Sequence, residues 1–136
     1  MLKPEKFDKY DWNYKDAIQI AEDNDFLVLQ SRPGLLLLDL DNPEALAHYE
    51  THLPLVARDF DLLEVSRYTS QSGKGTHIVL SCAPIKDMNL RIALQAVLGS
   101  DRKREALALR MAKQGIENPS WLFRPPQDQE TTNVTI

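Results

Sequence analysis

The apolar run Leu35–Asp41 (LLLLDLD) constrains the fold more than any other stretch of the chain. Successive apolar residues after a Pro-Gly turn are typical of an interior β-strand. Side chains alternate between the two faces of a strand, so Asp39 and Asp41 point to the same face. Neighbouring carboxylates repel each other and are costly to bury unless a cation lies between them. The pattern indicates a divalent-metal site, and the alternative is an ordinary strand end with Asp41 or Asn42 capping the next helix.

Length and composition indicate a single globular domain. The 136 residues, 43% of them hydrophobic, are enough for one core. The net charge of −4 means that a polyanion would have to meet a local basic patch or a metal. The single cysteine, Cys82, excludes an intramolecular disulfide and fits a reducing compartment. No apolar run approaches the roughly 18–20 residues that cross a membrane, so we expect a cytoplasmic protein without membrane association.

The order of the expected elements predicts an α+β fold. Two hairpins would form a four-stranded antiparallel sheet with helices on one face. Residues 1–126 would form one domain, followed by a flexible tail at 127–136. The expected strands are Phe26–Gln30 paired with Leu35–Asp41, and Leu62–Ser70 paired with Thr76–Cys82, with a short last strand at 121–123. The expected helices are Tyr14–Asn24, one that starts at Asn42-Pro43-Glu44, Asn89–Leu98 and Ser100–Gln114.

The segment Ser72–His77 (SGKGTH) is a candidate anion-binding loop. It is not a Walker A loop, because Tyr68 stands where that motif needs its first glycine and Gly75 where it needs serine or threonine. Its two glycines would let backbone N–H groups approach an anion, and Lys74 would add a positive charge. His77 would open the next strand at the edge of the same site. The alternative is a flexible hairpin loop followed by a surface histidine.

Two other histidines, His48 and His52, are four residues apart on the helix after the acids. This spacing places them on one helix face, where they could hold a metal. No third ligand is evident in the sequence nearby, so a solvated helix face is the favoured interpretation.

Together, the strand that ends in Asp-x-Asp and the later Ser-Gly-x-Gly-x-His resemble the first two motifs of the archaeo-eukaryotic primase superfamily. The resemblance spans about residues 35–101 and implies an RRM-like antiparallel sheet. It implies that Asp39 and Asp41 hold catalytic divalent ions, and that Ser72 and His77 contact the phosphates of a nucleotide. Gly73, Lys74 and Gly75 would assist in that phosphate contact.

The same resemblance implies a third metal-binding acid. Asp101 is the best placed, since it follows an apolar helix and a glycine, and Glu64 and Asp87 are weaker candidates. An acid that stabilises the start of a helix explains Asp101 equally well. The chain has no Cys/His cluster for the zinc-binding insertion of many such primases, and no helicase or priming domain accompanies the core.

The resemblance implies a primase or polymerase, which makes primers by nucleotidyl transfer on a single-stranded template with Mg²⁺ or Mn²⁺. Nucleoside triphosphates, the template and a replicative helicase are the expected partners of such a phage- or plasmid-type protein. Asp39, Asp41, Asp101 and His77 would form the catalytic site. The template would lie on six basic residues: Arg67, Arg102, Lys103, Arg104, Arg110 and Lys113. A solvent-exposed helix face without a partner explains the charged run on the last helix equally well. The alternatives are a non-catalytic binding module of the same fold and a metal-dependent nuclease or phosphohydrolase.

Overall fold

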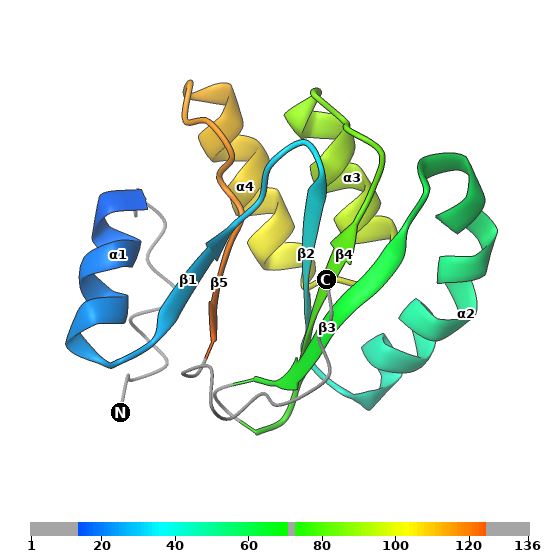
Figure 1. Cartoon of the computed structure of the whole chain (residues 1–136), viewed down its shortest axis with the longest axis horizontal. Coiled ribbons are helices and arrows are strands. Elements are labelled where there is room, and N and C mark those ends of the chain that lie inside the picture. Colours follow the sequence, from blue (N-terminus) through cyan, green and yellow to red (C-terminus); the bar gives the residue numbers. More distant parts are fainter. Residues whose placement is uncertain (1–13, 71–72, 125–136) are drawn as a thin grey trace.

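The computed structural model describes residues 14–70 and 73–124 and contains both helices and antiparallel strands (Figure 1). The predicted α+β class is therefore confirmed. Residues 1–13 and the predicted tail at 127–136 lie outside the described residues. The elements are α1 (Tyr14–Asp23), β1 (Leu27–Gln30), β2 (Leu35–Leu40), α2 (Pro43–Phe60), β3 (Leu63–Thr69), β4 (Thr76–Ser81), α3 (Met88–Val97), α4 (Arg102–Lys113) and β5 (Trp121–Arg124).

The strands form two sheets and not the single four-stranded RRM-like sheet that the sequence predicts. One sheet has the order β2-β4-β3, and the other consists of β1 and β5. The predicted hairpin of β3 and β4 is confirmed, with antiparallel pairing from Leu63↔Ser81 to Thr69↔Thr76. The predicted hairpin of β1 and β2 is wrong, because β1 pairs with β5 from Leu27↔Arg124 to Gln30↔Trp121.

The turn between β1 and β2 explains why these two strands do not pair. The Leu35 N–H donates to the Arg32 carbonyl across a distance of 2.8 Å, so the turn closes on itself around Pro33. The Ser31 N–H instead donates to the Ser120 carbonyl (2.9 Å) and continues the pairing of β1 with the segment before β5. Two apolar strands joined by a short turn look like a hairpin in the sequence, but here β1 pairs with β5, and β2 has β4 on one edge and the side chains of Gln95 and Ser100 on the other.

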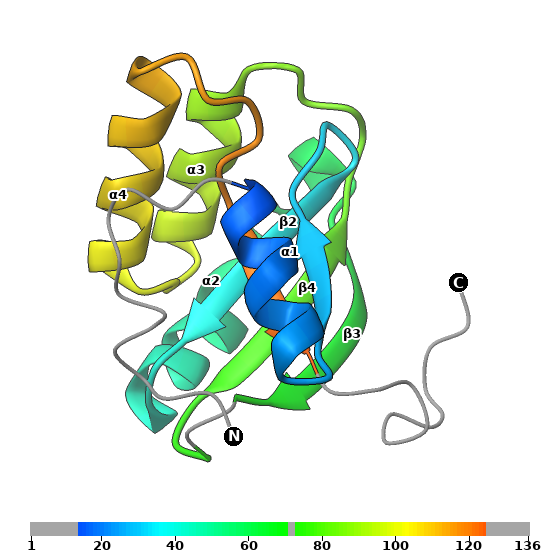
Figure 2. The same ribbon diagram turned by 90° about the vertical axis from the view of Figure 1, so that its left-hand side faces the viewer.

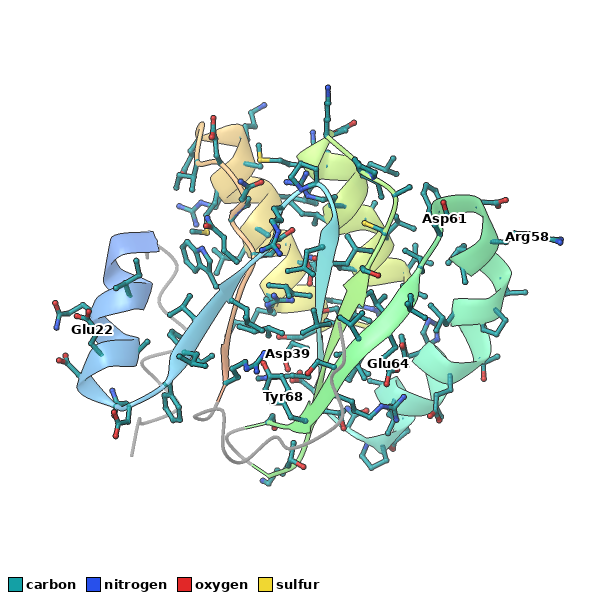
Figure 3. All side chains as sticks on the ribbon, viewed as in Figure 1. Glu22, Asp39, Arg58, Asp61, Glu64 and Tyr68 are labelled. Carbon is teal, nitrogen blue, oxygen red and sulfur yellow. The ribbon has the colours of Figure 1, made fainter. Side chains whose placement is uncertain are left out.

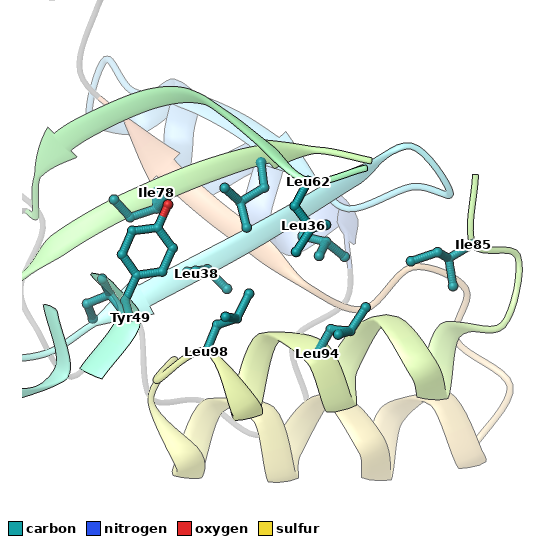
Figure 4. Close-up of a cluster of buried hydrophobic side chains, with 10 residues drawn as sticks. Leu36, Leu38, Tyr49, Leu62, Ile78, Ile85, Leu94 and Leu98 are labelled. Carbon is teal, nitrogen blue, oxygen red and sulfur yellow. The ribbon is translucent and has the colours of Figure 1, made fainter. Parts of the chain in front are cut away.

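The run of leucines in β2 is buried on both faces of the strand. Leu36, Leu38 and Leu40 are fully buried in a core shared with α2 and α3 (Figure 4). Leu37 points the other way and packs with Val79 and Leu122. An apolar run without alternation is what a strand covered on both sides requires.

The helices do not all lie over one face of a single sheet. Tyr49 of α2, Leu94 of α3 and Leu98 at the C-terminal cap of α3 belong to the main core, and α4 packs beside α3. Helix α1 instead contacts β1 and β5, apart from α3 and α4 (Figure 2). None of the described helices is long and apolar enough to cross a membrane.

The start of α2 confirms the predicted cap. Asn42 accepts a hydrogen bond from the Ala45 N–H (2.8 Å), and Pro43 occupies the first turn, where its missing N–H costs nothing. The helix continues through Pro54 and ends at Phe60. Asp41 therefore lies in the short connection between β2 and this cap, and Asn42, not Asp41, caps the helix.

Candidate functional site

The candidate site lies at the end of β2, on the face that also carries Leu37. Asp39 stands directly opposite His77 on β4, and His77 stands opposite Tyr68 on β3. The Nε2 atom of His77 is 3.3 Å from Oδ1 of Asp39, and the Tyr68 ring meets the imidazole edge-on with centroids 5.1 Å apart. Figure 3 shows Asp39 and Tyr68 on the same part of the sheet. Strand pairing thus builds a row of three polar side chains across three strands.

Asp101 comes to this row from the connection between α3 and α4. Its backbone N–H donates to the carbonyl of Asp39 (2.8 Å), which holds the two residues side by side. Its carboxylate also caps α4 by accepting from the Lys103 N–H (3.3 Å). Ligand atoms of Asp39, Asp41 and Asp101 all lie within 4.8 Å of one another. We call these three residues the acidic triad.

The two weaker candidates for the third acid are engaged elsewhere. Glu64 accepts hydrogen bonds from Tyr49 (2.7 Å) and Arg67 (2.9 Å) on the α2 side of β3. Asp87 caps α3 by accepting from the N–H groups of Asn89 and Leu90. Of the proposed third acids, the structure brings only Asp101 to Asp39 and Asp41.

Electrostatics separate the two acids of the Asp-x-Asp pair. Burial raises the pKa of Asp39, but the hydrogen bond and positive charge of His77, with the charge of Arg104, outweigh it and hold this pKa below its usual value. Loss of hydration and the negative charges of Asp39 and Asp101 raise the pKa of Asp41 from 3.8 to about 6, against the opposing charge of His77. Crowded negative charge therefore disfavours ionised Asp41.

The donor set of the acidic triad fits a hard divalent cation. Three carboxylates offer only oxygen ligands, which suit Mg²⁺ or Mn²⁺ better than zinc. A cation among them would replace repulsion by attraction and favour the ionised form of Asp41. His77 approaches Asp39 through its own ring nitrogen and so lies behind this carboxylate as an orienting partner, as in many metal sites.

His77 is buried, with 9% of its surface exposed. The alternative interpretation, a surface histidine after a flexible loop, is therefore wrong for this residue. Its Nδ1 atom is buried and has no hydrogen-bond partner among the described residues. When both ring nitrogens are protonated, Nε2–H donates to Asp39 and Nδ1–H is left to donate to another acceptor.

The glycine loop is organised differently from the expected anion cradle. Ser72 lies outside the described residues. The N–H of Gly73 donates to the Ser70 carbonyl (2.9 Å), and the N–H of Gly75 donates to Ser70 Oγ (3.0 Å). Both glycine N–H groups are thus used within the loop, and the side chain of Lys74 is exposed beside them.

Gly75 has a packing role at the acidic triad. A Cβ atom on this residue would lie 2.4 Å from the Leu40 carbonyl oxygen and 3.2 Å from Cα of Asp41. The absence of a side chain therefore lets the start of β4 approach the end of β2, where Asp41 leaves the strand.

Two of the six basic residues assigned to a template already have partners within the chain. Arg67 forms ion pairs with Glu64 (2.9 Å) and Glu50 (3.3 Å). Arg104 donates to the carbonyls of Leu37 and Trp121 and to Glu105. These bonds occupy donors that a template would otherwise use, although Arg67 remains exposed, and the assignment of both residues to a template stays a prediction. The remaining four basic residues are exposed on α4: Arg102, Lys103, Arg110 and Lys113.

The paired histidines on α2 are bonded to backbone carbonyls. The Nε2 atom of His48 lies 2.8 Å from the Val97 carbonyl oxygen, and Nδ1 of His52 lies 2.8 Å from that of His48. The two rings stack with centroids 3.8 Å apart. Their contacts connect α2 to the end of α3 and bring no third metal ligand to the pair among the described residues.

Sequence reasoning missed a buried polar group behind the acidic triad, formed by Gln95, Ser100 and Glu105 with Arg104. The available signal was a glutamine inside an apolar helix (NLRIALQAVL) and a serine directly before the capping Asp101. Neither type of residue is unusual at such positions, so the pattern did not single them out.

Comparison with known proteins gives no family assignment. The chain matches no protein-family model, no curated protein and no solved structure.

Proposed function

We propose that this chain binds Mg²⁺ or Mn²⁺ through the acidic triad and performs nucleotidyl transfer there, as a primase-polymerase does. The observation that carries the proposal is the meeting of three carboxylates from two distant segments, with ligand atoms within 4.8 Å, beside a histidine. A cation among these carboxylates would remove the repulsion that raises the pKa of Asp41. The order of the motifs along the chain supports the same reading, because it resembles that of the primase superfamily.

Each residue of the site would have a distinct task. When bound, a divalent ion polarises phosphate oxygens and favours deprotonation of an attacking hydroxyl. Asp39, oriented by His77 and by the Asp101 N–H, would form the fixed part of the cation site. Exposed Asp41 would complete it on the solvent side, where a triphosphate can approach. The Nδ1 atom of His77 is buried, so it would contact a phosphate oxygen only after neighbouring side chains move.

The exposed face of α4 is the surface that we assign to a single-stranded template. Arg102 and Lys103 directly follow Asp101, and Arg110 and Lys113 lie farther along the same helix. Basic side chains next to a catalytic site hold nucleic acid mainly through its phosphates, which gives binding without sequence preference.

The second candidate is a non-catalytic module that binds a metal–nucleotide complex or nucleic acid without turnover. The internal bonding of the Gly73 and Gly75 N–H groups and the ion pairs of Arg67 favour it, because both reduce the groups left to grip a substrate. A metal-dependent nuclease or phosphohydrolase would use the same acids, and its products would differ.

The test is a primer-synthesis and primer-extension assay with the full chain, single-stranded DNA, nucleoside triphosphates and Mn²⁺. Wild-type protein is expected to make oligonucleotides, and the Asp39→Ala/Asp41→Ala double variant is expected to make none. Asp59→Asn, an exposed acid on α2, serves as the matched control. Activity that persists in the double variant would overturn the metal assignment.

A capping-neutral variant isolates the third acid. Asn is as good a helix cap as Asp, so Asp101→Asn keeps the hydrogen bond to Lys103 but removes one carboxylate. We expect thermal stability that is retained or slightly raised, because one repelling charge is removed, together with loss of Mn²⁺ binding in a calorimetric titration. Nucleotide binding without product in the wild type would favour the binding module, and strand cleavage or phosphate release would favour the hydrolase.

A further inference from the structure

The outer edge of β2 is closed by the α3–α4 segment and not by another strand. The Leu37 N–H donates to Oε1 of Gln95 (2.9 Å), and the Asp39 N–H donates to Oγ of Ser100 (2.9 Å). The Asp39 carbonyl in turn accepts from the Asp101 N–H (2.8 Å). Side-chain and backbone groups of this segment thus take the place of a neighbouring strand along the residues that lead into the site.

Ser100 occupies the centre of this arrangement. Its side chain accepts from the Asp39 N–H and donates its own hydrogen to Oε2 of Glu105 (2.7 Å). The residue is 1% exposed, so no water competes for these bonds. A hydroxyl that accepts on one side and donates on the other is fixed in rotation by its two partners.

Glu105 fixes Ser100 in turn. Its carboxylate is 2% exposed and receives hydrogen bonds from Ser100, Gln95 (2.9 Å) and Arg104 (2.6 Å). All three partners are donors, which matches an ionised carboxylate, since that group only accepts. Burying such a charge is costly unless it is paired, and Arg104 supplies the opposite charge.

We propose that Ser100, held by Glu105, is a positioning residue that keeps Asp101 in register with Asp39 and so assembles the acidic triad. Asp101 directly follows Ser100. The two residues hold Asp39 together, because Ser100 Oγ accepts from the Asp39 N–H and the Asp101 N–H donates to the Asp39 carbonyl. Loss of the hydroxyl leaves the Asp39 N–H without its partner and frees the connection that carries the third carboxylate. The effect on metal binding rests on the function proposed above, whereas the effect on the local geometry does not.

The test compares two variants of this pair with a matched serine. Ser100→Ala removes the hydroxyl, and Glu105→Gln keeps the shape but turns an N–H donor toward the three groups that donate to Glu105. Ser66→Ala, on β3, is the control, because Ser66 is also buried (8% exposed) and none of the observed contacts joins it to the triad. Each full-length protein is titrated with Mn²⁺ by electron paramagnetic resonance at a temperature at which circular dichroism shows it folded.

We expect Ser100→Ala to weaken Mn²⁺ binding about tenfold, the lower end of the effect of removing a partner of a metal ligand, and Glu105→Gln to weaken it in the same direction. Ser66→Ala is expected to bind as the wild type does, even where its melting temperature falls. If the wild type binds Mn²⁺ and Ser100→Ala binds it with the same affinity, the positioning role is overturned while the proposed metal site is retained.

Amide hydrogen exchange in the metal-free protein tests the positioning role of Ser100 separately from metal binding. The Asp101 amide should exchange about tenfold faster or more in Ser100→Ala, while the amides of the β3–β4 pairing keep their protection. This result would support the positioning role even if wild-type protein bound no Mn²⁺. Retained protection of the Asp101 amide would overturn it.

Discussion

At the scale of single residues, the neighbours of Asp41 disfavour its ionised form. Reduced hydration and the charges of Asp39 and Asp101 raise its pKa to about 6. The folded protein therefore binds the Asp41 proton more tightly than the unfolded chain does. As the pH rises from about 4 to about 6, the ionisation of Asp41 lowers the free energy of unfolding, and above pH 6 this loss stays constant. A residue that lowers stability at neutral pH is typical of a functional position.

We expect Asp41→Asn to stabilise the metal-free protein above pH 6, by about 1 kcal/mol once solvent screening of this exposed side chain is considered. The gain should shrink below pH 6 and vanish near pH 4, where Asp41 is already neutral in the folded protein. Urea unfolding with a chelator at about pH 7.5 and about pH 4.5 measures it, with Asp59→Asn as the control. An equal change at both pH values would contradict the assigned repulsion.

At the scale of elements, the glycine loop joins β3 and β4 and also supports the end of β2. Gly73 has a φ of +80° and open space around it, whereas a Cβ on Gly75 would collide with the Leu40 carbonyl. The two glycines therefore have different reasons to lack a side chain, although the sequence presents them as one Gly-Lys-Gly motif.

We expect Gly73→Ala to cost about 1 kcal/mol of stability for its left-handed backbone and to leave Mn²⁺ affinity unchanged. Gly75→Ala should cost about 1–3 kcal/mol for the forced separation of two strands and should also weaken Mn²⁺ binding, because Asp41 moves with its Cα. Urea unfolding and calorimetric Mn²⁺ titration of both variants check this. Equal Mn²⁺ affinity in the two variants would show that Gly75 does not set the position of Asp41.

Elements whose signals are local could be predicted from the sequence. The Asn42-Pro43 cap of α2 and the β3–β4 hairpin depend on residues close to one another, and both are present. The partner of β1 could not be predicted, because β5 arrives from the other end of the described chain and is no more apolar than β2. Asp101 was identified from its place after an apolar helix, but the Ser100–Glu105 contact depends on tertiary packing that leaves no periodic pattern.

At the scale of the whole molecule, Arg104 connects the two sheets. Its guanidinium donates to the Leu37 carbonyl of β2 (3.2 Å) and to the Trp121 carbonyl of β5 (3.1 Å), where no backbone ladder joins these strands. The same group neutralises Glu105 behind the acidic triad. Arg104 therefore joins the two sheets beside the apolar contact of Leu37 with Leu122, and it also supports the candidate site.

We expect Arg104→Met to lower the free energy of unfolding by about 3–5 kcal/mol, because it leaves the Glu105 carboxylate buried without its cation. Adding Glu105→Gln should recover part of this loss, since the buried group is then neutral. The control is Arg102→Met, an exposed change on the same helix that should stay within about 0.5 kcal/mol of wild type. Urea unfolding measures all three variants. If Arg104→Met loses no more free energy of unfolding than Arg102→Met, backbone and apolar contacts alone hold the two sheets together. The buried ion pair would then have no role in supporting the site.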